Sequence, residues 1–255
     1  MQVSAQSFGE MNFGTAQLGD LRRTRRLVQS ADLMCDRPGG SLPQKFRAPK
    51  NLRAFYRLMQ CDEVTHAAVL APHRDVVLNA ATDSDETRLV LHDATELDYT
   101  DHVTLDDLGQ IGNGNRRGYI AQNSLAVNPG TREVLGLCNQ VLHRRDTVPK
   151  GETAAEKRER ESRESRLWLK GVAPLPEDRR LVDVCDQGAD TFEFLEHEVH
   201  SGRRFVIRAA YDRGTLIGHD APQSCASSLL RTYAAQLESA GSWQLHLTSS
   251  VKHKS

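Results

Sequence analysis

The sequence has few aromatic residues and no long apolar run. Aromatic residues make up 5% of its 255 residues. No apolar stretch approaches the ~20 residues that a membrane-spanning helix needs, and the amino terminus has no charged-then-apolar signal pattern. These absences argue against secretion and membrane insertion, and we expect a cytoplasmic protein without a membrane partner.

The chain also has few cysteines and almost no net charge. The five cysteines are widely spaced and form no Cys-x-x-Cys pair, which favours reduced, buried thiols over a disulfide framework or a zinc site. The formal net charge is −1, but residues 1–60 hold ten Lys and Arg against four Asp and Glu. A basic head on an acidic body is typical of a separate DNA-binding module, although a solvated helix face would give the same count.

Helical periodicity in this basic head predicts two helices, at residues 18–35 and 49–59. The first carries a run of four arginines, and guanidinium groups on an exposed helix can bind phosphates bidentately. The second helix carries Tyr56 and Arg57, which could stack on bases or contact the DNA backbone. Tyr56 is alternatively a core residue. The predicted DNA contacts in the head are Arg22, Arg23, Arg25, Arg26, Tyr56 and Arg57.

Periodicity and breakers predict an alternating order of elements after residue 87. The order is strand (88–93), strand (119–127), strand (134–142), helix (153–170), strand (180–185), helix (189–200) and strand (204–210). This is the order of an RNase H-like fold, in which the first and fourth strands are neighbours. The predicted fold class is therefore α/β, with a small all-helical amino-terminal domain followed by an incomplete RNase H-like mixed sheet flanked by helices. The charged stretch 152–166 is expected to be an exposed helix with i, i+4 salt bridges.

Two aspartates are placed to share a site in such a sheet. Asp93 and Asp186 each follow a short β-type run and precede turn-forming residues, so each is expected at a strand end. Hard divalent cations prefer oxygen ligands, and phosphoryl-transfer enzymes hold two of them ~4 Å apart. The pair thus predicts half of a magnesium site, against the alternative of two unrelated strand-end residues. Asp98 and Asp101 are weaker candidates, expected in a solvated loop.

The sequence around Asp93 and Asp186 resembles the Tn-five-like (insertion-sequence-four) branch of DDE transposases over roughly residues 8–213. The matching segments, in the family's order, are FGTAQLGDLRRTRRL (13–27), GGSL (39–42), AFYRL (54–58), HDATELDYT (92–100), LGQIG (108–112), Arg117-Gly118, VLGLCNQ (134–140) and VCDQGAD (184–190). The resemblance implies that Asp93 and Asp186 are the first two catalytic acids of a site that uses two Mg²⁺ ions. It also makes Arg208, on the expected fifth strand, a possible DNA contact, although an outward-facing arginine equally protects an edge strand.

The resemblance implies cut-and-paste transposition, in which transposon ends of double-stranded DNA are bound, cleaved and transferred. The family's third acid, a glutamate in a Tyr-x-x-Arg-Trp-x-Ile-Glu type motif, has no match in this sequence. We therefore expect a truncated chain that is inactive alone, with weakened metal binding and a nucleoid-associated location when bound to DNA. A second transposase chain or a downstream-encoded fragment would be its partner. The alternatives are a non-catalytic DNA-binding remnant that competes for transposon ends and, last, a free-standing nuclease.

These interpretations predict three segments. Residues 1–70 form the helical DNA-binding domain, residues 71–213 the partial RNase H-like core, and residues 214–255 the start of a β-rich insertion.

Overall fold

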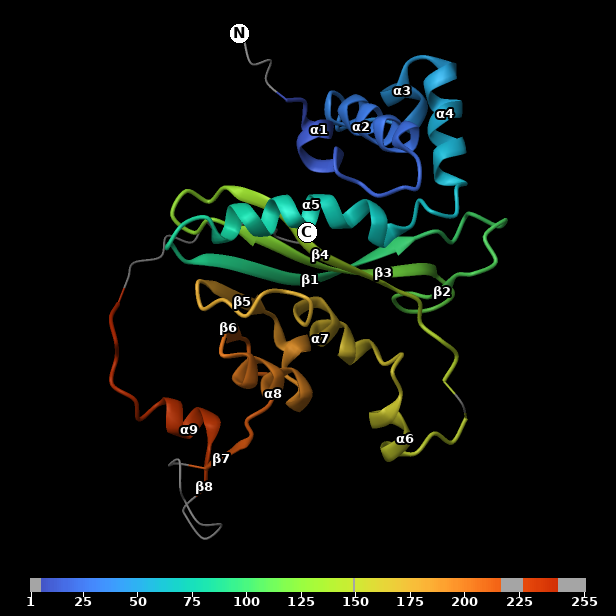
Figure 1. The fold of residues 1–255 in the computed structure, drawn as a ribbon. Coiled ribbons are helices and arrows are strands. Elements are labelled where there is room, and N and C mark those ends of the chain that lie inside the picture. The colour runs from blue at the N-terminus through green and yellow to red at the C-terminus, as the bar shows by residue number, and fades with distance from the viewer. Residues whose placement is uncertain (1–5, 149, 217–226, 243–255) are drawn as a thin grey trace, which may run out of the picture. The chain divides into compact units, whose positions relative to one another are not determined.

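A computed structural model describes residues 6–148, 150–216 and 227–242 (Figure 1). The chain divides into two compact units, residues 1–208 and residues 209–255. The larger unit contains a helical head and a mixed sheet with flanking helices. The predicted fold class is therefore confirmed at the level of a mixed α/β protein with amino-terminal helices. The domain boundaries predicted at residues 70 and 213 stay predictions.

Four helices form the head: α1 (Phe8–Phe13), α2 (Leu21–Cys35), α3 (Leu42–Phe46) and α4 (Pro49–Met59). The bounds of α4 are those predicted, because Pro49 favours the first helical position. Helix α2 begins three residues later than predicted, since the Asp20 side chain caps it by accepting from the Arg22 N–H over 2.8 Å. The head has an apolar core of Ala16, Leu18, Leu27 and Leu58, against which Ala68 and Val69 of the following helix also pack.

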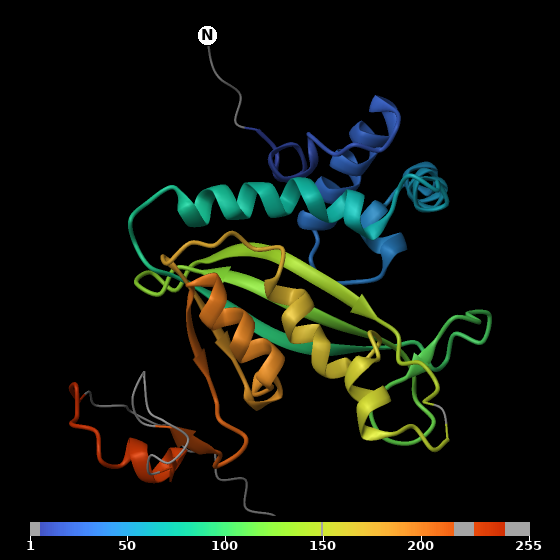
Figure 2. The ribbon, with the colours of Figure 1, turned by 60° about the horizontal axis from the view of Figure 1, so that its bottom comes forward.

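Helix α5 (His66–Thr82) follows the head and lies along strand β4 (Figure 2). The sequence interpretation contained no helix here. Pro72 interrupts the segment, and its apolar residues are spread around the helix rather than gathered on one face. The helix is stabilised by packing against the sheet rather than by a local amphipathic pattern, because Val77 and Ala81 are buried together with Val90 of the sheet.

The main sheet contains six strands: β1 (Arg88–Asp98), β2 (Gly109–Gln110), β3 (Arg117–Val127), β4 (Val134–His143), β5 (Leu181–Cys185) and β6 (Arg204–Ile207). Strand β1 is central. It pairs antiparallel with β3 and parallel with β5, while β2 and β4 pair with β3, and β6 with β5. The predicted pairing of the first strand (88–93) with the fourth (180–185) is confirmed by the parallel register of β1 and β5.

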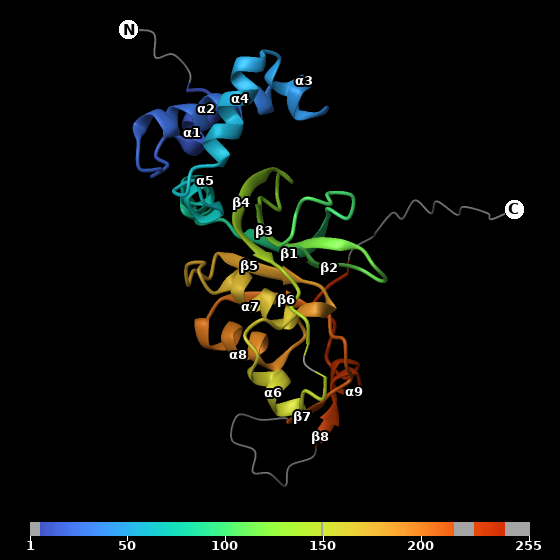
Figure 3. The same ribbon diagram turned by 90° about the vertical axis from the view of Figure 1, so that its right-hand side faces the viewer.

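Helices α7 (Leu167–Val172) and α8 (Phe192–Ser201) lie together (Figure 3), and α7 packs against β3 and β4, the strands that α5 also contacts. The helix predicted over 153–170 is wrong as a single element. It is divided into α6 (Ala154–Glu159), a 3-10 turn (Glu164–Arg166) and α7. The expected i, i+4 salt bridges do not form, because Arg163 pairs with Glu193 of α8 and Arg145 of the segment after β4 pairs with Glu164.

The second unit contains the antiparallel pair β7 (Gly214–Leu216) and β8 (Ser227–Leu229), followed by α9 (Leu230–Ala234). The Asp212 carboxylate accepts from the Arg231 N–H over 2.9 Å at the start of that helix. Across the described ranges of both units, no helix is long and apolar enough to cross a membrane.

Candidate nucleic-acid interface and paired aspartates

The sheet brings Asp93 and Asp186 to neighbouring positions. Strands β1 and β5 run parallel, and their last paired residues are His92 and Cys185. The next residue on each chain is an aspartate, so the two carboxylates leave the same face of the sheet from strands ~4.8 Å apart. Both residues are exposed. The juxtaposition that the strand order predicted is therefore present.

One oxygen of each carboxylate is held by the backbone. Asp93 Oδ1 accepts from the Ala94 N–H over 2.9 Å, and Asp186 Oδ1 accepts from the Gly188 N–H over 2.7 Å. Asp186 caps the 3-10 turn Gln187–Ala189, which packs on Trp168. A Cβ on Gly188 would lie 2.8 Å from Trp168 Cζ2, so only glycine allows this approach.

The local setting of Asp93 differs from the prediction. Asp93 lies in the middle of β1, which continues to Asp98, rather than at the end of its strand. Asp93 is level with the end of the neighbouring strand β5, because the pairing of β1 with β5 stops at His92 and Cys185. Asp98 is in the strand and not in a solvated loop, and it pairs with Arg116 over 2.8 Å. Hydrogen bonds from Thr100 and Arg116 lower the pKa of Asp98 to about 2.

A buried polar network lies behind the two aspartates, on the opposite face of the same strands. His92 Nε2 lies 2.7 Å from Asp183 Oδ1, and His92 Nδ1 lies 2.9 Å from the Ser124 hydroxyl. Arg203 pairs with Asp183 and with Glu198, at 3.1 Å in each case. This serine, histidine and aspartate have the order of a hydrolytic triad. All three are buried, however, so the arrangement supports the strands rather than a substrate.

Two carboxylates alone make an incomplete metal site. Their oxygens are the donors that Mg²⁺ prefers, and each retains an oxygen with no hydrogen-bond partner among the described residues. Among those same residues, however, no group of three or more His, Cys, Asp or Glu side chains could hold a metal ion. The two carboxylates are therefore the right type of ligand for a divalent cation, but two of them are too few to hold one.

The four predicted arginines of α2 divide into engaged and free groups. Arg23 pairs with Glu63 over 2.8 Å and donates to the Leu18 carbonyl, so it ties α2 to the end of the head. Arg22 pairs with the capping Asp20, and Arg26 donates to Gln29 over 2.7 Å. Arg25 is exposed and has no ion pair within the described ranges.

Helix α4 presents a basic face that the sequence interpretation found only in part. Lys50, Arg53 and Arg57 are exposed at i, i+3 and i+7, and none has an ion pair among the described residues. Tyr56 beside them is 46% exposed, so the alternative that it belongs to the core is wrong. Arg57 was predicted. Lys50 and Arg53 could have been found by applying the same helical spacing to residues 49–59.

A strained turn places one more basic residue next to this face. Arg47, between α3 and α4, has φ 52°, and the Ala48 N–H donates to the Phe46 carbonyl across it over 2.5 Å. This is a γ-turn, a conformation that is unfavourable for a residue with a side chain. The turn leaves Arg47 exposed immediately before the amino end of α4.

Arg208 follows the edge strand β6 and is exposed. Its N–H donates to the Cys185 carbonyl over 3.2 Å, so its backbone lies beside the residue that precedes Asp186. This position is compatible with a DNA contact next to the aspartates and with protection of the sheet edge. The two interpretations stay open.

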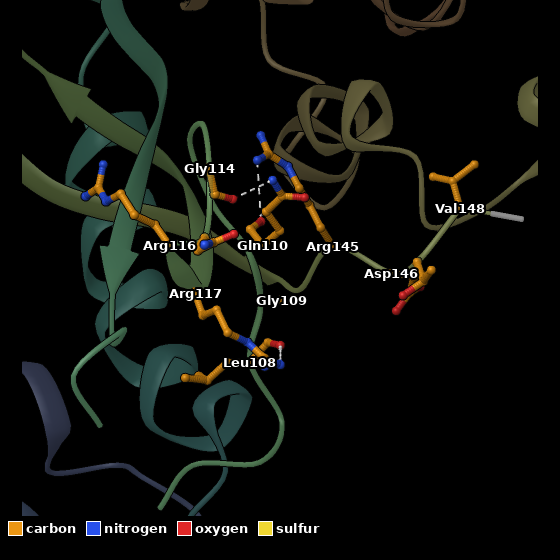
Figure 4. Close-up of a pocket in the computed structure, with 11 residues that line it drawn as sticks. Leu108, Gly109, Gln110, Gly114, Arg116, Arg117, Arg145, Asp146 and Val148 are labelled. Carbon is orange, nitrogen blue, oxygen red and sulfur yellow. Dashed lines mark hydrogen bonds between the residues drawn. The ribbon is translucent and has the colours of Figure 1, made fainter. Parts of the chain in front are cut away.

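A separate cavity of about 820 Å³ lies at the far end of β1, between β2, the start of β3 and the segment after β4 (Figure 4). Three arginines line it, but each is engaged: Arg117 with the Leu108 carbonyl, Arg116 with Asp98, and Arg145 with Glu164. Arg117 of the lining precedes Gly118, which pairs with Asp98, five residues along β1 from Asp93, or ~17 Å. The cavity therefore belongs neither to the aspartate pair nor to an unpaired basic surface.

Comparison with known families agrees with the basic head. The model of the transposase DNA-binding family matches residues 5–64, which include all of α1 to α4. The match supports DNA binding of the transposase kind and DNA as the partner of this segment.

Proposed function

We propose that this protein binds double-stranded DNA at transposon ends through its helical head, as a protein of the insertion-sequence-four type. The observation that carries the proposal is the unpaired basic face of α4 within the segment that matches the transposase DNA-binding family. Lys50, Arg53 and Arg57, with Arg47 before the helix, form a stripe that suits the phosphates along one groove. Arg25, exposed on α2, is a further basic residue of the head.

We further propose that the sheet is RNase H-like and that Asp93 and Asp186 are two acids of a DDE site. The support is the strand order around β1 and the parallel register that makes the two residues neighbours. When bound, Mg²⁺ would activate water and the scissile phosphate, with these two carboxylates as its protein ligands. A complete site needs a third carboxylate, which a second chain or a separately encoded fragment would supply.

DNA binding without catalysis is the second candidate. It is favoured by one observation, namely that the described residues bring only two carboxylates together. In this case the protein would occupy transposon ends and compete with a complete transposase.

Two experiments test these proposals. In a gel shift with duplex DNA, the double variant Arg53→Ala, Arg57→Ala should lose at least tenfold in affinity. Lys157→Ala, which removes an exposed charge from α6, should change little. Equal affinities for both variants would contradict the assigned interface.

The second experiment measures Mg²⁺-dependent nicking of supercoiled DNA that carries matched ends. We expect binding without turnover by this chain alone. Turnover that disappears in Asp93→Ala would contradict this expectation and would support a site completed within the chain.

A further inference from the structure

One histidine hydrogen-bonds to both the helical head and the sheet, while Ala68 and Val69 of the same helix pack against the apolar core of the head. His73 of α5 has its Nδ1 2.8 Å from Asn12 Oδ1 in α1, and its Nε2 accepts from the Leu137 N–H in β4 over 3.1 Å. The ring of Phe13 stacks on the imidazole, with ring centroids 6.1 Å apart and planes at 26°. One side chain is therefore bonded to the head on one edge and to the sheet on the other.

The neighbours of His73 define which nitrogen carries its proton. Asn12 Nδ2 donates to the Phe8 carbonyl over 2.9 Å, which turns Oδ1, an acceptor, toward Nδ1 of the ring. The Leu137 amide can only donate, so Nε2 must accept. The neutral ring with its proton on Nδ1 satisfies both partners. A protonated ring would place an N–H against the Leu137 N–H.

The sheet is shaped to admit the ring. Gly136, with φ 143°, lies against the imidazole, and a Cβ there would lie 3.0 Å from His73 Cε1 and 2.5 Å from Val77 Cγ2. This is a backbone conformation that other residues rarely adopt, so the glycine is required for both its conformation and the close approach.

Within the part of the chain that the structure describes, no charged neighbour offsets the cost of protonating His73. The titratable groups on the three elements that meet here are Glu10 on α1, His66, Arg74 and Asp75 on α5, and Cys138 and His143 on β4. Arg74 and Asp75 lie 4.0 Å from each other, and Glu10 is exposed. Burial is the only cause that shifts the pKa of His73, and it lowers that pKa below the ordinary value of 6.5.

We propose that neutral His73 fastens the DNA-binding head to the sheet and that its protonation releases the head. The neutral form is favoured in the folded protein, so the joint is complete above pH 6.5 and is lost as the pH falls through the lowered pKa. In the fastened state, the head has one fixed orientation with respect to β4.

A second contact extends this joint toward the aspartates. His66, at the start of α5, lies 2.9 Å from Gln140 Oε1, and Gln140 Nε2 donates to Asn123 Oδ1 over 2.7 Å. Asn123 is the register partner of Asp93 on β1. If the proposed function holds, α5 sets the distance between DNA bound at the head and the paired acids, and His73 is a positioning residue.

The test is nuclear magnetic resonance of the isotope-labelled protein without DNA. Imidazole nitrogen shifts should show the Nδ1–H tautomer at pH 7.5 and a pKa below 6.5 for His73. The Leu137 amide should be protected from hydrogen exchange at pH 7.5. Its protection, corrected for the intrinsic exchange rate, should fall at least tenfold as His73 protonates.

Two variants separate the joint from general stability. Glutamine at position 73 offers a donor and an acceptor without titrating, so His73→Gln should keep Leu137 protected and remove the pH dependence. His200→Gln, at an exposed histidine that hydrogen-bonds to the Glu196 carbonyl of its own helix, should leave the transition unchanged. An Nε2–H tautomer, a pKa at or above 6.5, or constant Leu137 protection would overturn the proposal.

These outcomes do not depend on DNA. A failed gel shift with a normal His73 titration would refute the proposed function and leave the joint standing. Normal DNA binding with constant Leu137 protection would refute the joint alone.

Discussion

Replacing Arg203 by methionine should remove a positive charge that pairs with two buried carboxylates, those of Asp183 and Glu198. The Arg203 side chain is 1% exposed, and those of Asp183 and Glu198 are both 0% exposed. The guanidinium lies 3.1 Å from each carboxylate and also donates to the Val172 and Leu175 carbonyls. Methionine has a similar length and can fill the same space without a charge.

The expected cost follows from the unpaired charges that remain. Removing one partner of a buried ion pair typically costs ~3–5 kcal/mol, because the other charge stays buried without compensation. We therefore expect Arg203→Met to lower the free energy of unfolding by ~3–5 kcal/mol at pH 8. Urea unfolding followed by tryptophan fluorescence would measure it. Arg204→Met, at the neighbouring exposed arginine that bonds Arg179 O and Thr87, is the control, with an expected cost below ~1 kcal/mol.

The pH dependence gives a second and sharper readout. Burial, and then the charge of Asp183, raise the pKa of Glu198 from 4.5 to about 7. A carboxyl group with a raised pKa contributes stability that is complete below pH 4.5 and is lost as the pH rises through 7. The protein should therefore lose up to ~3 kcal/mol between pH 5 and pH 8 from this group, since each pKa unit corresponds to ~1.4 kcal/mol.

Glu198→Gln should abolish this loss, because the amide cannot ionise. The reasoning would be refuted if Glu198→Gln retained the pH profile of the natural protein, or if Arg203→Met cost no more than Arg204→Met.

Three further predictions concern other parts of the chain. Arg53→Ala should weaken duplex binding equally for all sequences and reduce the slope of log affinity against log salt by about 0.9, and filter binding that shows an unchanged slope would exclude a phosphate contact. Gly188→Ala should destabilise the protein by ~1–3 kcal/mol in urea unfolding, because its Cβ would lie 2.8 Å from Trp168; a cost under ~0.5 kcal/mol would show that the turn can shift freely. Burial raises the pKa of the Cys138 thiol to about 12, so a thiol reagent at pH 8 should label the exposed Cys35 and leave Cys138 unmodified. Peptide mass spectrometry would measure the labelling, and equal labelling of both cysteines would contradict the burial of Cys138.

Local sequence was sufficient for elements with strong start signals or regular alternation. Helix α4 has its predicted bounds because Pro49 starts it and its apolar residues repeat at helical spacing. Strands β3, β4 and β5 lie within two residues of their predicted bounds. Their order around the first strand was enough to predict that Asp93 and Asp186 are neighbours, which the parallel register of β1 and β5 confirms.

Elements that depend on distant partners could not be predicted from local patterns. Strand β1 continues past Asp93 because β3 pairs with it as far as Gly118, although the segment after Asp93 is polar and resembles a turn. The charged segment after residue 152 is not one helix because Arg163 reaches Glu193, thirty residues away, and Arg160 has an extended backbone.

The sequence by itself determined the basic head, the order of strands and helices, and the two aspartates that the order brings together, because these depend on residue type and short-range periodicity. Only the tertiary structure decided which basic residues are free. Arg23 is occupied by Glu63, whereas Arg53 has no ion pair within the described residues. The tertiary structure also decided that α5 joins head and sheet through His73. That joint depends on Asn12, which is 61 positions from His73 in the chain, and on Leu137, which is 64 positions away, and these residues meet only after folding.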